Sequence, residues 1–354
     1  MTKKTTINPD SPKLLYFFGR PLAPLYAGLM ASRAALYSKN FFRRHQVRVP
    51  VVSVGNLTLG GTGKTPMVIY LARLLADQMK VAVVSRGYRG KARQKVNVVS
   101  DGSQIFLDAR KAGDEPNLMA HSLPGVAVLT GKKRIKPASY GVDVLGAEVI
   151  ILDDGFQHLS LRRDLDIVLF KVDTFMGNSR IFPGGDLREP LAALQRASCF
   201  VLTCVDEDNQ QLAAAQQAAL EKRFPSTPAF QASYEPVGLV AQGDQAIPVG
   251  SFPCGAFCGL ASPRNFQKSL EMAGLDVLFF KAFADHHDYS ERQLHSLVDR
   301  AKKAGAQALV TTEKDIVKLR GMRLDLPIFA LRMEMRVAGD FDMFVRKQLA
   351  TVAK

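Results

Sequence analysis

VVSVGNLTLGGTGKTPMVIY, residues 51–70, decides the fold of this chain. The valine-rich run at 51–54 predicts a buried strand. A glycine-rich turn follows, then Lys64 and Thr65, and then a segment with the composition of a helix. A strand, a glycine-rich loop, a Lys-Thr pair and a helix in this order are typical of a loop that cradles phosphate groups.

The residue types of this loop explain how it would bind phosphate. Glycines let the backbone turn tightly and point its N–H groups at phosphate oxygens, and the start of the following helix adds partial positive charge. Lys64 can reach β- and γ-phosphates, and the Thr65 hydroxyl can bind Mg²⁺. Thr58 stands where the GxxxxGK[ST] pattern has its first glycine, so the alternative is a glycine-rich turn without a ligand.

Composition narrows the class of partner. The chain has 354 residues and a net charge of +14, from 47 Lys and Arg against 33 Asp and Glu. This balance favours an acidic partner, which would be nucleic acid, an anionic membrane or a phosphorylated substrate. The absence of tryptophan and of an aromatic RNA-binding pattern argues against nucleic acid. The four cysteines form no C-x₂-C pair, so we expect buried free thiols in a reducing cytoplasm and no zinc site.

Apolar segments alternate with helical segments over residues 46–205. Strands that are apolar throughout and alternate with helices predict an α/β fold, with a parallel sheet covered by helices on both faces. After short strands and turns at 228–252, a second and smaller α/β alternation begins at 254. Further strands are expected at 81–86, 126–130, 147–152, 165–170 and 199–204, and helices at Met67–Met79 and Pro116–Ser122.

Two carboxylates directly follow the strand expected at 147–152. Asp153 and Asp154 would lie at the carboxyl edge of the sheet, beside the strand that precedes the glycine-rich loop. This is the place of the Mg²⁺ ligand in P-loop enzymes, and magnesium prefers hard oxygen ligands. The alternative is an Asp-Gly turn, and the sequence leaves open which of the two carboxylates would contact the metal.

Polar residues in two nearby loops are further candidates. Gln157 and His158 can hydrogen-bond a sugar or a phosphate, although a lone histidine is often structural. Arg188 can clamp a phosphate and Glu189 can join the metal ligands, although the two could equally form a surface ion pair.

Transfer of a phosphoryl group to a hydroxyl needs a proton acceptor, and the chain has candidate acidic groups in further loops. Asp114, in AGDEP, could take a proton from a hydroxyl, but Pro116 at a helix start makes an N-cap the serious alternative. The loop 283–290, FADHHDYS, contains two histidines, one of which could pair with a carboxylate across a cleft, although a solvated loop is the plainer interpretation. TTEKD at 311–315 resembles a guanine-reading TKxD element with the wrong spacing.

The N-terminal segment 13–44 is apolar and aromatic, with basic residues at both ends. Its longest uncharged run is too short to span a bilayer, which needs about 20 residues. One hypothesis is an interfacial helix, and the other is an arm packed on the domain's own core; the two are compatible. In the first, the apolar contacts would come from Phe17, Phe18, Leu25, Leu29 and Leu36, and the lipid-phosphate contacts from Arg33, Lys39, Arg43 and Arg44.

The ordered set SVGNLTLGGTGKTP, SRGYRG, AGDEP, ILDDGFQH, PGGDLREP, DHHDYS and TTEKD, between residues 53 and 315, resembles the tetraacyldisaccharide 4′-kinase family, the lipid A 4′-kinases of Gram-negative bacteria. The resemblance covers nearly the whole chain. The family's loop also lacks the first glycine, so Thr58 is no departure from it. A P-loop GTPase or switch ATPase would leave the acceptor-side motifs unexplained, and a kinase for a soluble small molecule would leave the N-terminal segment without a role.

The resemblance implies a P-loop kinase-like domain over 46–205, a smaller α/β domain over 206–354 that closes over the nucleotide cleft, and a membrane-associated helical segment over 1–45. It implies transfer of the γ-phosphate of ATP, assisted by Mg²⁺, to the 4′-hydroxyl of a tetraacylated disaccharide 1-phosphate. The place would be the cytoplasmic face of the inner membrane, and we expect a monomer that binds no nucleic acid.

The resemblance also implies a role for particular residues. Asp114 would be the base and His286 its partner, although the adjacent His287 stays an alternative. The nucleotide would be bound by Thr58, Leu59, Gly60, Gly61, Thr62, Gly63, Lys64 and Thr65. The Mg²⁺ site would use Thr65, Asp153, Asp154 and Glu189. The substrate and phosphate side would be lined by Arg86, Gln157, His158 and Arg188.

Overall fold

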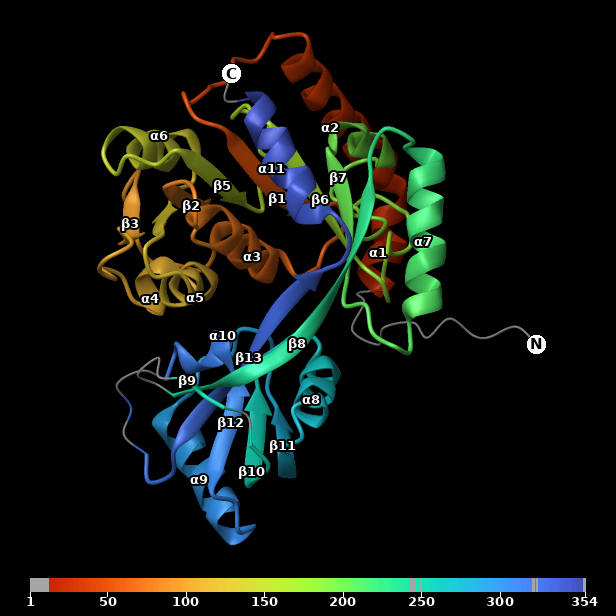
Figure 1. Ribbon diagram of the computed structural model, residues 1–354. Helices are drawn as coiled ribbons and strands as arrows, with labels where there is room; N and C mark the ends of the chain where they lie inside the picture. The colour runs from red at the N-terminus through yellow and green to blue at the C-terminus, as the bar shows by residue number, and fades with distance from the viewer. Residues whose placement is uncertain (1–12, 242–245, 249, 320–321, 323, 353–354) are drawn as a thin grey trace, which may run out of the picture.

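The computed structural model describes residues 13–352 apart from 242–245, 249, 320–321 and 323 (Figure 1). Within these residues a mixed, mostly parallel sheet runs through the whole molecule, and helices cover it on both faces. The strand order is β11-β10-β12-β13-β8-β7-β6-β1-β5-β2-β4-β3, with β9 beside β8.

The elements have the following bounds. The strands are β1 (Val51–Asn56), β2 (Val81–Ser85), β3 (Asn97–Ser100), β4 (Ala127–Thr130), β5 (Val149–Asp153), β6 (Leu165–Lys171), β7 (Cys199–Thr203), β8 (Ala229–Ala241), β9 (Ala246–Ile247), β10 (Pro253–Cys258), β11 (Asp276–Ala282), β12 (Ala308–Thr312) and β13 (Ile328–Val337). The helices are α1 (Lys13–Gly19), η1 (Arg20–Leu22), α2 (Ala23–Ser38), α3 (Lys64–Ala76), α4 (Ala109–Ala112), α5 (Asp114–Ser122), α6 (Ile135–Asp143), η2 (Leu191–Arg196), α7 (Gln210–Arg223), α8 (Pro263–Met272), α9 (Glu291–Lys303), α10 (Glu313–Ile316) and α11 (Phe341–Val352).

The strands of the larger part are apolar because both faces of its sheet are buried. On β1, Val52 and Val54 pack with residues of α3 and α11, whereas Val51 packs with residues of α6 on the opposite face. β5 and β6 flank β1, and both are parallel to it. The predicted parallel sheet with helices on both faces is therefore confirmed, and the carboxyl ends of these strands meet at one edge.

The smaller part is the second α/β layer predicted from residue 254 onward. β10, β11, β12 and β13 are parallel neighbours there. Phe257 packs with residues of α9, and Cys258 packs with residues of α8 on the other face. All four cysteines are free thiols; Cys199, Cys254 and Cys258 are buried as expected, whereas Cys204 is only half-buried.

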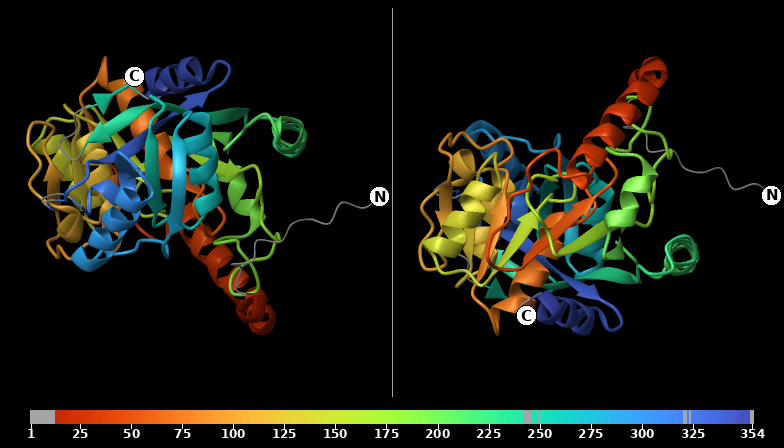
Figure 2. Two further views of the ribbon diagram at one scale, coloured as in Figure 1. Left: turned by 90° about the horizontal axis from the view of Figure 1, so that it is seen from below. Right: turned by 90° about the horizontal axis from the view of Figure 1, so that it is seen from above.

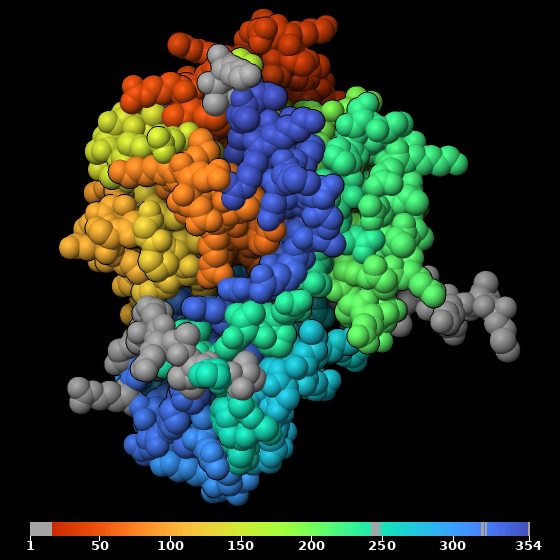
Figure 3. Space-filling view, in the orientation of Figure 1, coloured from red at the N-terminus to blue at the C-terminus, as the bar shows by residue number. Residues whose placement is uncertain are grey.

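A two-stranded ribbon joins the two parts (Figure 1). β8 starts beside β7 in the larger part and then pairs antiparallel with β13 along its whole remaining length. The expectation of short strands and turns at 228–252 was therefore wrong over Ala229–Ala241, although β9 is a short strand. Pro236 and Gly238 are residue types that usually interrupt a strand. In β8 they lie opposite Met333 and Arg332, where the pairing register shifts, and a proline, which has no N–H, is tolerated at such a place. In Figure 3 the larger part lies above the smaller part.

Two helices from beyond residue 206 pack on the larger part. Ala213 and Leu220 of α7 lie in one of its core clusters, and Phe341 and Val345 of α11 lie in another. We propose that the domain boundary lies near residue 205. With this boundary, α7 and α11 belong in sequence to the smaller domain but pack on the larger one.

The N-terminal helices α1 and α2 project from the body of the molecule (Figure 2). Their apolar side chains are largely exposed, for example Phe18 at 69% and Leu25 at 66%, whereas Leu36 is half-buried. The arm is nevertheless attached, because the Tyr16 hydroxyl donates to Asp186 at 2.6 Å and Arg33 donates to the backbone oxygen of Gln157 at 3.2 Å. None of the helices described is long and apolar enough to cross a bilayer. Residues 1–12 of the predicted segment lie outside the described part.

Candidate active site

The glycine-rich loop forms an open cradle at the carboxyl end of β1. Gly60 and Gly63 adopt φ values of 111° and 82°, which favour glycine. A Cβ atom on Gly63 would also collide with the Tyr234 hydroxyl of β8. α3 begins at Lys64, three residues before the expected start, and no side chain caps it. Its first N–H groups are therefore available to an anion.

Lys64 is already held over this cradle. Its ammonium donates to Asn56 Oδ1 at 3.2 Å and lies 3.6 Å from Asp154 Oδ1. Asn56 also donates to the backbone oxygen of Thr58 at 2.8 Å, which ties the loop to the end of β1. The loop that contains Arg188 is attached to the cradle too, because Leu59 and Arg188 make backbone hydrogen bonds across the two segments.

The two adjacent aspartates have opposite environments. Asp153 ends β5 and is buried; its Oδ2 accepts from the Ser85 hydroxyl at 2.9 Å, and no hydrogen bond of the described residues reaches Oδ1. Burial, together with the charges of Glu115 and Asp154, raises the pKa of Asp153 to about 6. A carboxylate oxygen that is buried without a partner suits a cation.

Asp154 is instead neutralised by protein groups. Arg188 Nη1 donates to both of its carboxylate oxygens, at 2.8 and 2.9 Å. Burial alone would raise the pKa of Asp154, but the charges of Lys64 and Arg188 outweigh burial and lower it. Of the two carboxylates, Asp153 is therefore the one that needs a further positive charge.

Glu189 and Thr65 are the other two predicted metal ligands. Glu189 is buried, and its Oε2 accepts from Arg196 at 2.5 Å while its Oε1 has no partner among the described residues. Thr65 lines a cavity of about 650 Å³ between α3 and the smaller part. No hydrogen bond or ion pair described here joins either residue to Asp153. Within the described residues, no group of three or more His, Cys, Asp or Glu could hold a metal by itself.

The predicted acceptor-side residues surround the end of β5. Gln157 donates to the backbone oxygen of Asn56 at 2.9 Å, and its own side-chain oxygen is buried without a partner among the described residues. Burial and then the charge of Arg134 lower the pKa of His158 to about 4, so its ring is neutral at pH 7. Arg86 follows β2 and is exposed.

Arg134 is a site residue that the sequence analysis did not select. Its side chain is only 4% exposed, and its Nε has no partner within the described part of the chain. Burial lowers its pKa, while the charges of Asp153 and Asp154 act in the opposite direction. The buried Nε–H of this guanidinium is a donor that a phosphate or sugar oxygen can accept from. The only signal in the sequence was its position in the basic turn that starts at Gly131.

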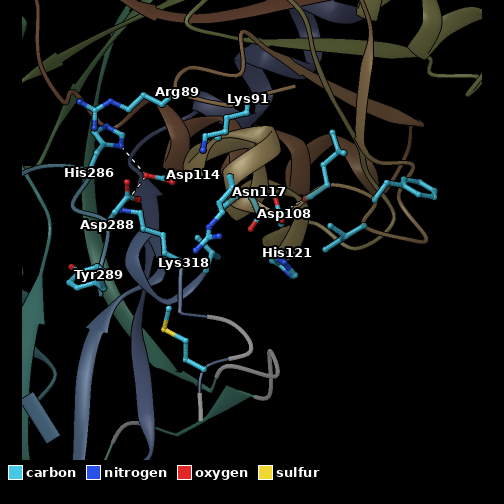
Figure 4. Close-up of a pocket in the computed structure, with 18 residues that line it drawn as sticks. Arg89, Lys91, Asp108, Asp114, Asn117, His121, His286, Asp288, Tyr289 and Lys318 are labelled. Carbon is cyan, nitrogen blue, oxygen red and sulfur yellow. Dashed lines mark hydrogen bonds and ion pairs between the residues drawn. The ribbon is translucent and has the colours of Figure 1, made fainter. Parts of the chain in front are cut away.

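Asp114 and His286 meet across the cleft between the two parts (Figure 4). His286 Nδ1 lies 3.0 Å from Asp114 Oδ2. Asp114 does not cap α5, because Gly113 holds the N-cap position and makes no side-chain cap bond. His287 turns away; its ring stacks on Phe283, and its Nε2 lies 3.2 Å from Gln293. The structure therefore brings the first of the two histidines to the carboxylate.

The TTEKD segment fixes the orientation of the His286 ring. Lys314 Nζ lies 3.2 Å from His286 Nε2 and 3.0 Å from Asp285. An ammonium can only donate, so Nε2 must accept, and the proton of the neutral ring lies on Nδ1 and points to Asp114. Asp315 of this segment is fully buried and accepts from the Gly259 N–H at 2.9 Å.

The Asp114–His286 pair opens on a cavity of about 860 Å³. Arg89 and Lys91, from the loop after β2, reach into it from one side, and Asp288 and Lys318 from the other (Figure 4). The cavity is therefore large enough for part of a sugar and is lined with cations. A phosphate cradle, a buried unpaired carboxylate and a His-supported carboxylate are groups that can serve transfer of a phosphoryl group to a hydroxyl.

Comparisons with known proteins agree with this chemistry. A family model described as tetraacyldisaccharide-1-P 4′-kinase matches residues 15–350. A tetraacyldisaccharide 4′-kinase of Desulfotalea psychrophila is 46% identical over 343 residues, which are 96% of this chain and 98% of the relative. One of Syntrophus aciditrophicus is 42% identical over 86% of this chain and 85% of the relative. A crystal structure of LpxK from Aquifex aeolicus in complex with ATP is 34% identical, with a TM-score of 0.77 over 93% of this chain and 98% of that one.

Proposed function

Since this chain belongs to the tetraacyldisaccharide-1-P 4′-kinase family, we propose that it transfers the γ-phosphate of ATP to the 4′-hydroxyl of a tetraacylated glucosamine disaccharide 1-phosphate. It is a phosphotransferase with an alcohol acceptor, and it is an ATP-dependent lipid A 4′-kinase. The finer proposal rests on the contact between Asp114 and His286 at the start of α5. The residue after Asp114 is Glu115; burial and then the charge of Glu115 raise the pKa of Asp153. A proton acceptor and a cation-binding carboxylate would thus act together on the bound nucleotide and the acceptor.

The cradle from Thr58 to Thr65 would bind the ATP phosphates. The open N-terminus of α3 and the glycine N–H groups offer donors, and Lys64 adds a positive charge above them. Lys64 and Arg188 both lie on Asp154 and could move onto phosphate oxygens when ATP binds. Charge that builds up on the transferred group would then be offset by fixed cations.

Mg²⁺ fits this site through the free oxygen of Asp153. Asp153 Oδ1 is buried without a partner among the described residues, and the Asp153 pKa of about 6 leaves the carboxylate mostly ionised at pH 7. We assign Thr65 and Glu189 as further ligands and Asp154 as a neighbour of the ion. When bound, Mg²⁺ would neutralise and orient the phosphate oxygens.

Asp114 would take the proton of the acceptor hydroxyl. As the sugar oxygen bonds to the γ-phosphorus, the bond from that phosphorus to the bridging oxygen breaks, and ADP leaves. The proton moves to the Asp114 carboxylate, which the Nδ1–H of His286 holds in place. Arg86, Gln157, His158 and Arg188 would line the acceptor, with the neutral His158 ring and the Gln157 oxygen able to hydrogen-bond sugar hydroxyls.

The N-terminal helices would bring the enzyme to its lipid. Their exposed apolar side chains lie beside Arg33, Lys39, Arg43 and Arg44, which suits an anionic bilayer surface. We propose a peripheral, monotopic attachment at the cytoplasmic face of the inner membrane, where both ATP and the lipid are accessible. Within this proposal the enzyme acts as a monomer.

Transfer of labelled γ-phosphate tests the proposed function. The protein is incubated with labelled ATP and a tetraacyl-disaccharide 1-phosphate in mixed micelles, with and without Mg²⁺. We expect a labelled bis-phosphorylated lipid that depends on Mg²⁺. Label found only as free phosphate, with or without lipid, would reject the acceptor and leave a switch ATPase as the better interpretation.

Membrane attachment is tested by three substitutions in the arm. Phe18→Gln, Leu25→Gln and Leu29→Gln together remove side chains that are 69%, 66% and 57% exposed, and each loses about 1.5–3 kcal/mol of burial in a membrane. We expect the variant to stay folded and no longer float with anionic vesicles.

A matched control keeps the number and exposure of the changes. Val144→Gln, Met272→Gln and Met343→Gln alter side chains that are 60%, 58% and 62% exposed elsewhere on the protein. This control should float like the wild type. Continued flotation of the arm variant would place the membrane contact on another surface.

A further inference from the structure

Lys318 is a buried lysine whose ammonium has an oxygen partner for each of its three protons. Its side chain is only 7% exposed, and it follows α10 in the smaller part. Its Nζ lies 3.2 Å from Asp114 Oδ2, 3.1 Å from the backbone oxygen of His287 and 3.4 Å from Asp315 Oδ1. An ammonium has three protons to donate, and here each has an oxygen within reach. Lys318 is therefore fixed in one position.

Asp315 explains why Lys318 is so firmly held. This carboxylate is fully buried and accepts from the Gly259 N–H at 2.9 Å and from the Thr312 hydroxyl at 2.8 Å. Its position is set by the Thr312 side chain at the end of β12 and by the backbone N–H of Gly259 in the loop after β10. The Lys318 ammonium is thus anchored on one side and reaches Asp114 of the larger part on the other.

The two donors to Asp114 contact the same carboxylate oxygen. Oδ2 receives both Lys318 and the Nδ1–H of His286, and no hydrogen bond described here reaches Oδ1 (Figure 4). The carboxylate plane is therefore fixed from one side, while the other oxygen remains available to a hydroxyl.

We propose that Lys318 is a positioning residue for the transfer reaction, which holds Asp114 ionised and turned with Oδ1 toward the acceptor hydroxyl. This proposal rests on the proposed role of Asp114 as base. Burial alone would raise the pKa of Asp114, but the His286 hydrogen bond and the charge of Lys318 outweigh it and lower that pKa. The enzyme would thus keep a competent base on the acid side of neutrality.

Other charged groups also face Asp114, and the test has to separate them from Lys318. Arg89 and Lys91 line the cavity from the loop after β2, and Asp288 lines it from the loop that contains His286. Asp285 and Lys314 act on the far side of the His286 ring. All of these remain unchanged when Lys318 alone is replaced.

Lys318→Met removes the charge and keeps the length of the side chain. We expect kcat to fall about 10- to 100-fold at neutral pH, part of what a general base contributes, with KM for ATP unchanged. Because the lost cation raises the pKa of Asp114, the acid limb of the pH–kcat profile should move to higher pH. Lys318→Gln keeps a donor but no charge, tolerates burial better, and should shift the same limb with a smaller loss of kcat.

Lys302→Met is the matched control. Lys302 forms an exposed ion pair with Asp325 at 3.1 Å in the same part of the protein. Its replacement should leave the pH profile in place. An unshifted acid limb in both Lys318 variants would overturn the proposal, as would a loss of kcat equal at every pH.

A double variant separates this proposal from the proposed function. If Lys318 acts through Asp114, Lys318→Met should lower kcat less than about 3-fold in the Asp114→Asn background. If the kcat losses of the two single variants multiply in the double variant, the positioning role of Lys318 is wrong, while the role of Asp114 as base is unaffected. Full turnover in Asp114→Asn itself would overturn the base, and with it this proposal.

Discussion

Lys64→Ala is expected to reduce phosphoryl transfer by about a thousandfold or more, because it removes the one cation of the cradle that can follow the phosphates through the reaction. In the structure, Lys64 is held between Asn56 and Asp154 at the start of α3. The Arg188 guanidinium reaches Asp154 from a separate loop and is present in the wild type as well, so it does not make up for the lost ammonium. Transfer of labelled phosphate to the lipid measures the loss.

The fold should survive this change. The Lys64–Asp154 pair is 3.6 Å long and Asp154 is 38% exposed, so its loss costs at most about 1 kcal/mol. Thermal unfolding should therefore be nearly unchanged. Lys222→Ala, an exposed lysine on α7, removes the same charge away from the cradle and should leave turnover intact. Wild-type turnover in Lys64→Ala would reject the cradle as the nucleotide site.

The larger part of the fold was predictable because its signals are local. A strand buried on both faces needs a continuous apolar run, and β1, β2, β5, β6 and β7 each have one. A phosphate loop needs glycines with positive φ at set positions, which Gly60 and Gly63 supply. Both requirements concern residues that are neighbours in the chain, so they can be recognised from the sequence alone.

The long ribbon could not be predicted, because its cause is tertiary. β8 contains Pro236 and Gly238, both of which favour a turn in isolation. Pairing with β13 over ten residues, from Ala232 to Ala241, outweighs that local preference, and a register shift accommodates the proline. The ends of helices were also displaced, because α3 begins at Lys64 where the backbone leaves the cradle and not at the first apolar residue.

The candidate site was predictable where motifs lie next to each other and not where the chain folds back. Asp153 and Asp154 could not be told apart in sequence, since the difference lies in Ser85 at the end of β2 and Arg188 in a loop, both distant in the chain. Asp114 and His286 are 172 positions apart, and only a resemblance linked them. Lys318 looks like any other lysine until folding buries it.

Asp114→Asn is expected to lower kcat about 10²- to 10⁴-fold while the affinity for ATP changes little, because the amide keeps the shape but cannot take a proton at neutral pH. Asparagine can still accept the hydrogen bond from His286 Nδ1, which lies 3.0 Å away, so the ring and the cavity should remain in place. Steady-state transfer and equilibrium titration with ATP measure the two quantities separately.

Asp108→Asn supplies the matched control in the same cavity. Asp108 caps α4 by accepting from the Lys111 N–H at 2.8 Å, and asparagine serves equally well at an N-cap. This variant should keep turnover within a few fold. Unchanged kcat in Asp114→Asn would show that the Asp114–His286–Lys318 contacts only join the two parts of the protein. A loss of kcat confined to Asp114→Asn supports instead a carboxylate that receives the proton, since shape and hydrogen bonding to His286 are preserved and the Lys318 variants measure the loss of the ion pair separately.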